Sequence, residues 1–137
     1  MRSSWVVVGL MALAVGSADA QQARSILFIG NSFTFGSGSA VRYWRANTVT
    51  DLNDEGTGGV PALFKSFTDQ TGLPYDVYLE TRGGSAFEFH LREQLPELTR
   101  QAWDVVVAHP YSTLDRGTPG DPTALTATVP ALRGSLR

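Results

Sequence analysis

Cysteine is absent from the 137-residue sequence, which excludes disulfide bonds, thiolate metal ligands and a cysteine nucleophile. Lysine occurs once and the ten arginines are scattered, so no cationic patch for nucleic acid is present, and the formal net charge is -2. Two histidines are too few for a histidine-based structural zinc site. We therefore expect no nucleic-acid partner, no metal and no other cofactor.

The N-terminus has the three parts of a secretory signal peptide. Arg2 supplies the positive start, residues 5–15 form an apolar run, and Ala18-Asp19-Ala20 has the small-x-small pattern of a cleavage site. The apolar run is too short to span a bilayer, and no later stretch is apolar enough to do so. We expect cleavage after residue 20 and a secreted or periplasmic domain at residues 21–137, with no membrane span.

Short buried strands alternate with amphipathic helices along that domain. Apolar runs predict strands at 25–30, 75–81 and 104–108, while periodic spacing predicts helices at 59–71, 85–100 and 122–132. Residues 31–58 lack periodicity and are read as a long loop with a short helix near 40–46. This order predicts an α/β fold with a parallel sheet covered by helices on both faces. Three strands are few for this class, so we expect the fold to be incomplete.

The most informative segment is Gly30-Asn31-Ser32-Phe33-Thr34, at the end of the first predicted strand. Ligands of open parallel sheets bind outside the carboxyl ends of the strands, so the Ser32 hydroxyl would face such a site. Thr34 stands where the nucleophile elbow of other hydrolases has glycine. The alternative is a loop serine that caps a helix.

A second segment, Gly83-Gly84-Ser85-Ala86, follows the next strand and opens a helix. Glycine lets backbone N–H groups approach a ligand closely, and a helix start offers free N–H donors to an anion. The alternative is an ordinary turn built on two glycines. The third segment, residues 103–113, contains Trp-Asp-Val-Val-Val and then His109, Pro110 and Tyr111.

Together these segments resemble the SGNH (GDSL) serine hydrolases, in the variant whose first block reads Gly-Asn-Ser-Phe-Thr. The resemblance implies a three-layer, flavodoxin-like fold in which Ser32 is the nucleophile. It also implies that the backbone N–H groups of Ser32 and Gly84, or alternatively Gly83, bind the oxyanion. The family's third oxyanion donor is Asn or Gln; here His109 is the candidate, and Tyr111 could also donate. An ordinary loop histidine is the alternative for His109.

His90 falls in a Gly-Gly-x-x-Phe-x-x-His pattern that one branch of the family shares, in which it is not the general base. We interpret it as a histidine hydrogen-bonded at the edge of the core.

The family's catalytic acid and base lie in an Asp-x-x-His motif, which this sequence lacks. The resemblance covers residues 24–132, about the first half of a family domain, so we expect a domain truncated at its C-terminus and inactive by itself. The predicted function is that of a secreted esterase acting through Ser32 on a small-molecule, carbohydrate or lipid ester. The alternative is a secreted, non-enzymatic protein that binds a ligand or partner on the same scaffold.

A nucleotide-binding loop at Gly36–Gly38 is a third reading, but Val41 breaks the required glycine spacing. The sequence leaves the oligomeric state open.

Overall fold

A computed structural model describes residues 21–136 of the chain. The predicted signal peptide lies outside these residues. Within them, no helix combines the length and apolar character needed to cross a membrane.

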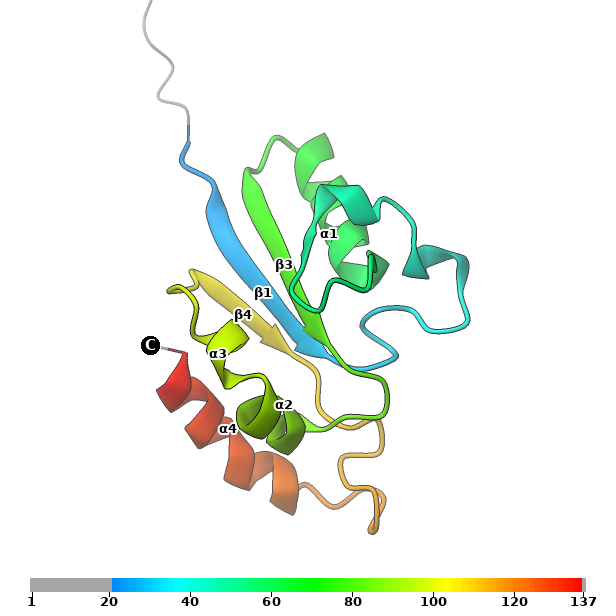
Figure 1. The fold of residues 1–137 in the computed structure, drawn as a ribbon, viewed down its shortest axis with the longest axis vertical. Helices are drawn as coiled ribbons and strands as arrows, with labels where there is room; N and C mark the ends of the chain where they lie inside the picture. The colour runs from blue at the N-terminus through cyan, green and yellow to red at the C-terminus, as the bar shows by residue number, and fades with distance from the viewer. Residues whose placement is uncertain (1–20, 137) are drawn as a thin grey trace, which may run out of the picture.

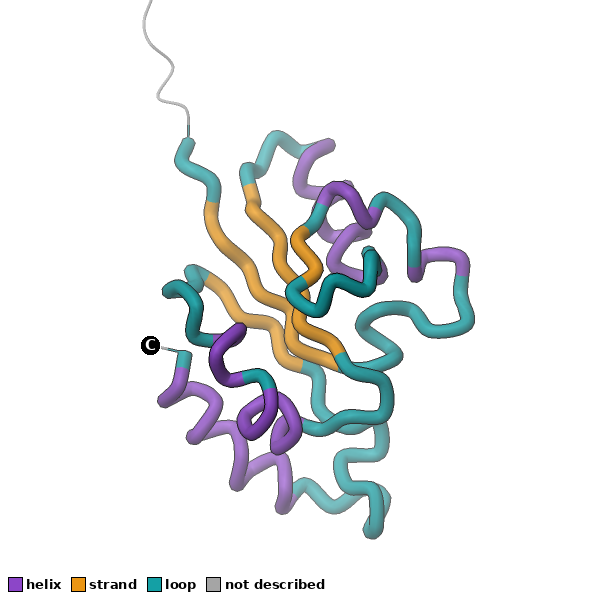
Figure 2. The backbone as a smooth tube through the Cα atoms, viewed as in Figure 1, coloured by secondary structure: helices purple, strands orange, loops and turns teal. Residues whose placement is uncertain are grey.

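Four parallel strands form a single sheet in the order β2-β3-β1-β4 (Figures 1 and 2). Their bounds are Arg24–Gly30 for β1, Thr50–Asp51 for β2, Tyr75–Thr81 for β3 and Val105–Ala108 for β4. β1 is the central strand, paired with β3 along its whole length and with β4 from Ile26 to Ile29. The predicted α/β class and the parallel arrangement of the sheet are therefore confirmed.

Helices cover both faces of the sheet, as alternating side chains of β1 require. Leu27 and Ile29 point to the layer of α2 (Phe87–Glu93), α3 (Leu95–Leu98) and α4 (Thr123–Ser135). Ile26 and Phe28 point to the layer of α1 (Gly59–Gln70). Phe64 of α1 packs edge-on against Phe28, with ring centroids 5.5 Å apart. Because β1 is apolar on both faces, it can only be stable between two helical layers.

Two details differ from the sequence-based expectation. The region 31–58, expected to contain only loop and a short helix, adds the two-residue strand β2 and two 3-10 turns, at Ala40–Arg42 and Ala46–Thr48. Two residues are too short to show an alternating pattern. The helix expected at 85–100 is divided at Gln94, because Pro96 has no N–H to donate in a helix interior and instead lies in the first turn of α3.

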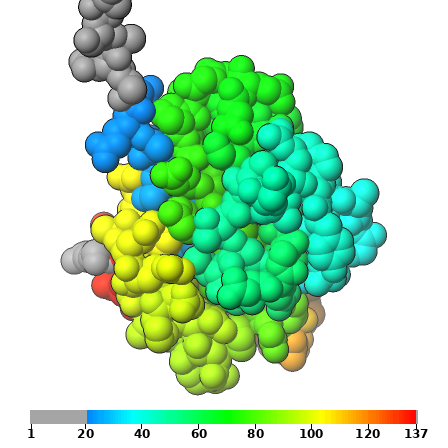
Figure 3. Space-filling view, turned by 45° about the horizontal axis from the view of Figure 1, so that its top comes forward, coloured from blue at the N-terminus to red at the C-terminus, as the bar shows by residue number. Residues whose placement is uncertain are grey.

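In Figure 3 the segment that joins β1 to α1, coloured cyan to blue-green, forms a lobe on one side of the molecule.

β4 is an edge strand, and no strand within residues 21–136 pairs with its outer side. Its connection to β1 is strengthened by Asp104, which lies just before β4. The Asp104 carboxylate accepts hydrogen bonds from the backbone N–H of Ser25 (2.7 Å) and from the Ser25 hydroxyl (3.0 Å). These two bonds, the backbone one first, lower the pKa of Asp104 below its ordinary value.

The lowered pKa predicts an acid-sensitive contribution to stability. The charged form of Asp104 is favoured in the folded state, so its contribution is complete above the ordinary aspartate pKa of about 3.9 and is lost as the pH falls through the folded pKa. We expect Asp104→Asn to lower the urea midpoint at about pH 7, and we expect this difference to shrink as the pH falls below about 3.9. Asp76→Asn, an exposed position at the start of β3, is the matched control and should show no such convergence. If the urea midpoints of Asp104→Asn and the unmodified protein differ as much in acid as at about pH 7, the charged form of Asp104 does not stabilise the fold.

Candidate active site

The candidate site lies where the winding of the sheet reverses direction. From β1 the chain crosses through α1 to β3 on one side, and from β3 it returns over the opposite face through α2 and α3 to β4. The loops after β1 and β4 therefore leave the sheet toward opposite faces (Figure 1). In open parallel sheets the crevice between such strands is the usual place for a ligand. Ser32 and His109 lie in these two loops.

The turn after β1 depends on the glycine that ends the strand. A Cβ atom at Gly30 would lie 2.0 Å from the Thr34 hydroxyl oxygen, so no larger residue fits. The chain then coils, with backbone hydrogen bonds from Phe35 to Asn31 and from Ser37 to Ser32. This tight coil brings the half-buried Ser32 to the end of the strand.

Ser32 and Gly84 have the donors that an oxyanion site needs. Neither backbone N–H donates to an acceptor among residues 21–136. Gly84 has a φ of +70°, which favours glycine, and its carbonyl oxygen accepts a hydrogen bond from Arg116 at 2.9 Å. That bond holds the Gly84–Ser85 peptide, whereas the N–H of Gly84 belongs to the preceding peptide and has no acceptor among residues 21–136. No described side chain forms a hydrogen bond with the Ser32 hydroxyl, so the structure shows no partner for it within this part of the chain.

Asn31 joins the loops after β1, β3 and β4. Its side chain is buried, at 2% exposure, and its amide nitrogen donates to the carbonyl oxygens of Pro110 (2.9 Å) and Ser85 (3.4 Å). Its amide oxygen accepts from the backbone N–H of Phe33. One amide therefore uses both of its donors and an acceptor to hold Ser32, Gly84 and His109 at the same edge of the sheet.

His109 follows β4 directly. Its backbone N–H donates to the Ile29 carbonyl at 2.8 Å and so continues the sheet. Its ring lies 5.9 Å from the Phe33 ring, and its Nδ1 atom is buried with no hydrogen-bond partner among the described residues. Because Nδ1 is buried, a hydrogen bond from His109 to a ligand would have to come from Nε2, which has no hydrogen-bond partner among the described residues. Tyr111, the other candidate donor, lies beneath the Arg116 guanidinium.

His90 is not exposed at this edge. It is 1% exposed, and both ring nitrogens form hydrogen bonds, one to Glu80 and one to Ser85. The interpretation of His90 as a hydrogen-bonded core histidine is confirmed. Glu80, a fully buried carboxylate in β3, was missed, although an acidic residue within an otherwise apolar strand is itself a signal.

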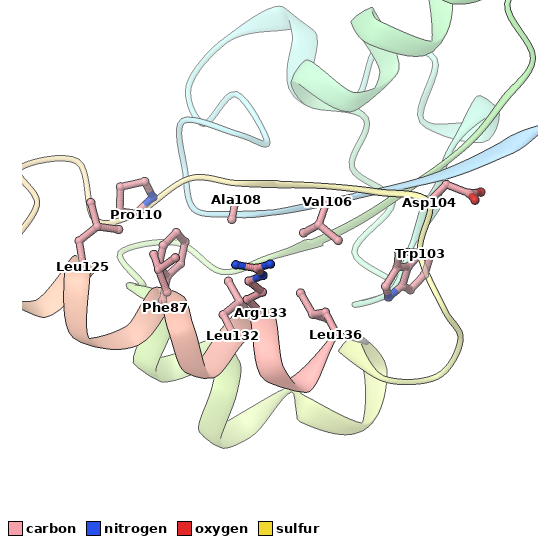
Figure 4. A pocket seen from close by; sticks show the side chains of 11 residues that line it. Phe87, Trp103, Asp104, Val106, Ala108, Pro110, Leu125, Leu132, Arg133 and Leu136 are labelled. Carbon is pink, nitrogen blue, oxygen red and sulfur yellow. The ribbon is translucent and has the colours of Figure 1, made fainter.

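A cavity of about 820 Å³ lies elsewhere, between β4 and α4 (Figure 4). Its walls are mainly apolar, with Phe87, Leu132 and Leu136 below β4 and the Arg133 side chain directed toward the strand. It contains neither Ser32 nor Gly84 nor His109. We place the candidate chemistry at the strand ends, because Asn31 joins the loops of Ser32, Gly84 and His109 there and none of these three residues lines the larger groove.

Comparison of the chain with protein-family models, with curated proteins and with solved structures finds no significant match.

The Asn31 contacts predict a strong effect of a small change. Asn31→Asp keeps the shape and the bond to Phe33 but removes both donors and turns a carboxylate toward two carbonyl oxygens. We expect the free energy of unfolding to fall by about 3 kcal/mol in urea denaturation, because buried polar groups lose their partners. Asn47→Asp, at an exposed position of the 3-10 turn Ala46–Thr48 and with the same charge change, should stay within about 0.5 kcal/mol. Equal losses in both variants would contradict the proposed role of Asn31.

Proposed function

We propose that the chain has the scaffold of an SGNH-type serine esterase and acts on an acyl ester through Ser32. The observation that carries the proposal is that Asn31 joins the loops of Ser32, Gly84 and His109 at the reversal of the sheet, where the backbone N–H groups of Ser32 and Gly84 have no acceptor among residues 21–136. The central strand order, with β1 between β3 and β4, is compatible with the flavodoxin-like form of this fold. We also propose that residues 1–20 direct the protein to the periplasm or out of the cell.

The proposed chemistry begins with attack of the Ser32 oxygen on the ester carbonyl. The resulting oxyanion accepts hydrogen bonds from the Ser32 and Gly84 N–H groups, and the His109 ring is a third candidate donor. A serine nucleophile also needs a base to accept its proton, and no described side chain forms a hydrogen bond with the Ser32 hydroxyl. We therefore expect very slow turnover by this chain alone, because the oxyanion donors without a base supply only part of the acceleration.

An added base offers a direct test. We expect imidazole in the buffer to take the role of the base, so that the purified protein is acylated by p-nitrophenyl butyrate and a butyryl group appears on Ser32 in peptide mass spectrometry. Ser32→Ala should abolish this adduct, whereas Ser37→Ala, an exposed serine in the same loop, should retain it. Absence of a Ser32 adduct at every imidazole concentration would favour the alternative, a secreted binding protein on this scaffold.

An apolar pocket lined by the two residues that follow Ser32 supports an aliphatic acyl group as part of the substrate. Its volume is about 250 Å³, and its walls include Phe33, Val60 and Val107, with Thr34 and His109 as its polar members. Because Phe33 and Thr34 directly follow Ser32, a short hydrocarbon chain attached to the reacting carbonyl could lie in it. No charged side chain lines this pocket, so it favours an uncharged chain.

The pocket predicts which acyl groups are preferred. Val60→Phe should fill it and reduce imidazole-dependent labelling by the butyrate ester relative to the acetate ester by at least about tenfold, the usual effect of excluding a methylene or two. Val129→Phe is the control, since Val129 has nearly the same exposure (43% against 44%) but lies on α4. An unchanged butyrate-to-acetate ratio in Val60→Phe would exclude this pocket as the acyl site.

A further inference from the structure

Beneath the candidate site, three side chains form a buried network outside the proposed chemistry. Glu80 and His90 are 0% and 1% exposed, and Ser85 is 7% exposed. The Glu80 carboxylate contacts His90 Nδ1, and His90 Nε2 lies 2.9 Å from the Ser85 hydroxyl oxygen. The connectivity is that of a serine–histidine–carboxylate triad, which raises the question of whether His90 could activate Ser85.

The direction of the Ser85 hydrogen bonds shows that it cannot. The Ser85 hydroxyl oxygen is 2.7 Å from the carbonyl oxygen of Arg82, which can only accept, so the hydroxyl must donate there. The same oxygen then accepts from His90, and Nε2 of His90 must therefore carry a proton. A nitrogen that already carries a proton cannot take one from Ser85. This arrangement is the reverse of that in a catalytic triad.

A second proton lies between His90 Nδ1 and Glu80, since two unprotonated atoms would repel each other at hydrogen-bond distance. The pair is then either an imidazolium with a carboxylate or a neutral imidazole with a carboxylic acid, and its net charge is zero in both cases. Burial favours a Glu80–His90 pair with zero net charge, because a net charge would be costly in a site closed to water. The second oxygen of Glu80 accepts from the Asn53 amide at 3.3 Å, which completes the network on the side of β2.

The network ends on the segment that carries Gly84. Ser85 bonds to the Arg82 carbonyl through both its hydroxyl and its backbone N–H (3.2 Å), which closes the turn Arg82-Gly83-Gly84-Ser85. The carbonyl of Ser85 is also an acceptor for Asn31. We propose that Glu80 and His90 are positioning residues whose fixed proton count holds this turn, and with it the Gly84 N–H, in place beside Ser32. The part of this proposal that concerns ester chemistry rests on the proposed function.

The proton count can be measured by NMR of the ¹⁵N-labelled protein near neutral pH. We expect a proton on His90 Nε2, seen as a one-bond ¹H–¹⁵N correlation that exchanges slowly with water, and a second proton shared between Nδ1 and Glu80. His109, which lies outside the network, is the internal reference. An unprotonated Nε2 on His90 would overturn the proposal and would identify His90 as a base for Ser85.

His90→Asn tests the positioning role. The amide nitrogen of asparagine can take the place of Nδ1 and still donate to Glu80, whereas no atom replaces Nε2, so the Ser85 hydroxyl loses its donor. We expect the Ser85 amide to exchange at least about tenfold faster with solvent, relative to the Leu27 amide in β1, and the Gly84 amide resonance to shift, as for loss of one hydrogen bond of about 1.4 kcal/mol. Glu97→Gln, an exposed glutamate on α3, should change neither. Equal acceleration at Ser85 and Leu27 would mean that His90 stabilises only the fold, and would overturn the proposal.

The same His90→Asn variant tests whether the network affects the proposed reaction at Ser32. Imidazole-dependent butyryl labelling of Ser32 should fall at least about tenfold, with the loss in the rate of acylation and not in the ester concentration needed for half-saturation. Unchanged labelling would overturn the positioning role. If the unmodified protein shows no Ser32 adduct, the proposed function fails, whereas the proton on His90 Nε2 and the exchange of the Ser85 amide still decide for or against the network.

Discussion

The structure depends on the burial of one strand between two others and two helical layers. β1 pairs with β3 and β4, and its Leu27 and Ile29 side chains are completely buried. The candidate site residues lie at the carboxyl end of this strand. Ser32 follows β1, and the loops after β3 and β4 bring Gly84 and His109 to the same edge of the sheet. A parallel sheet offers this arrangement because all its carboxyl ends lie together.

Buried polar groups at that edge cost free energy unless they find partners. Asn31, Glu80 and His90 each find partners in a different loop or element, so the cost of burying them also fixes how those loops lie. Apolar side chains at these positions would lack directional hydrogen bonds and would not fix the loop of Gly84 in one position. We regard this specification as the physical basis of the candidate site, in keeping with polar networks that rigidify a core when every member is satisfied.

Much of the fold could be predicted from the sequence because its signals are local. The strand at 75–81 and the start of the helix at residue 59 agree with the structure, since apolar runs, glycine and proline act within a few residues. The strand at 50–51 and the break at Gln94 could not be predicted as readily. The first is created by pairing with β3, and the second by competition between helical spacing and a proline.

The sequence by itself determined the α/β class, the exclusion of cysteine chemistry and the candidate residues Ser32, Gly84 and His109. Only the tertiary structure decided what lies beside them. It showed that Asn31 joins three loops, that His90 is buried between Glu80 and Ser85, and that no described side chain meets the Ser32 hydroxyl. The physical reason is that partners such as Asn31 and Pro110 lie 79 positions apart in the chain, and only the folded sheet brings them into contact.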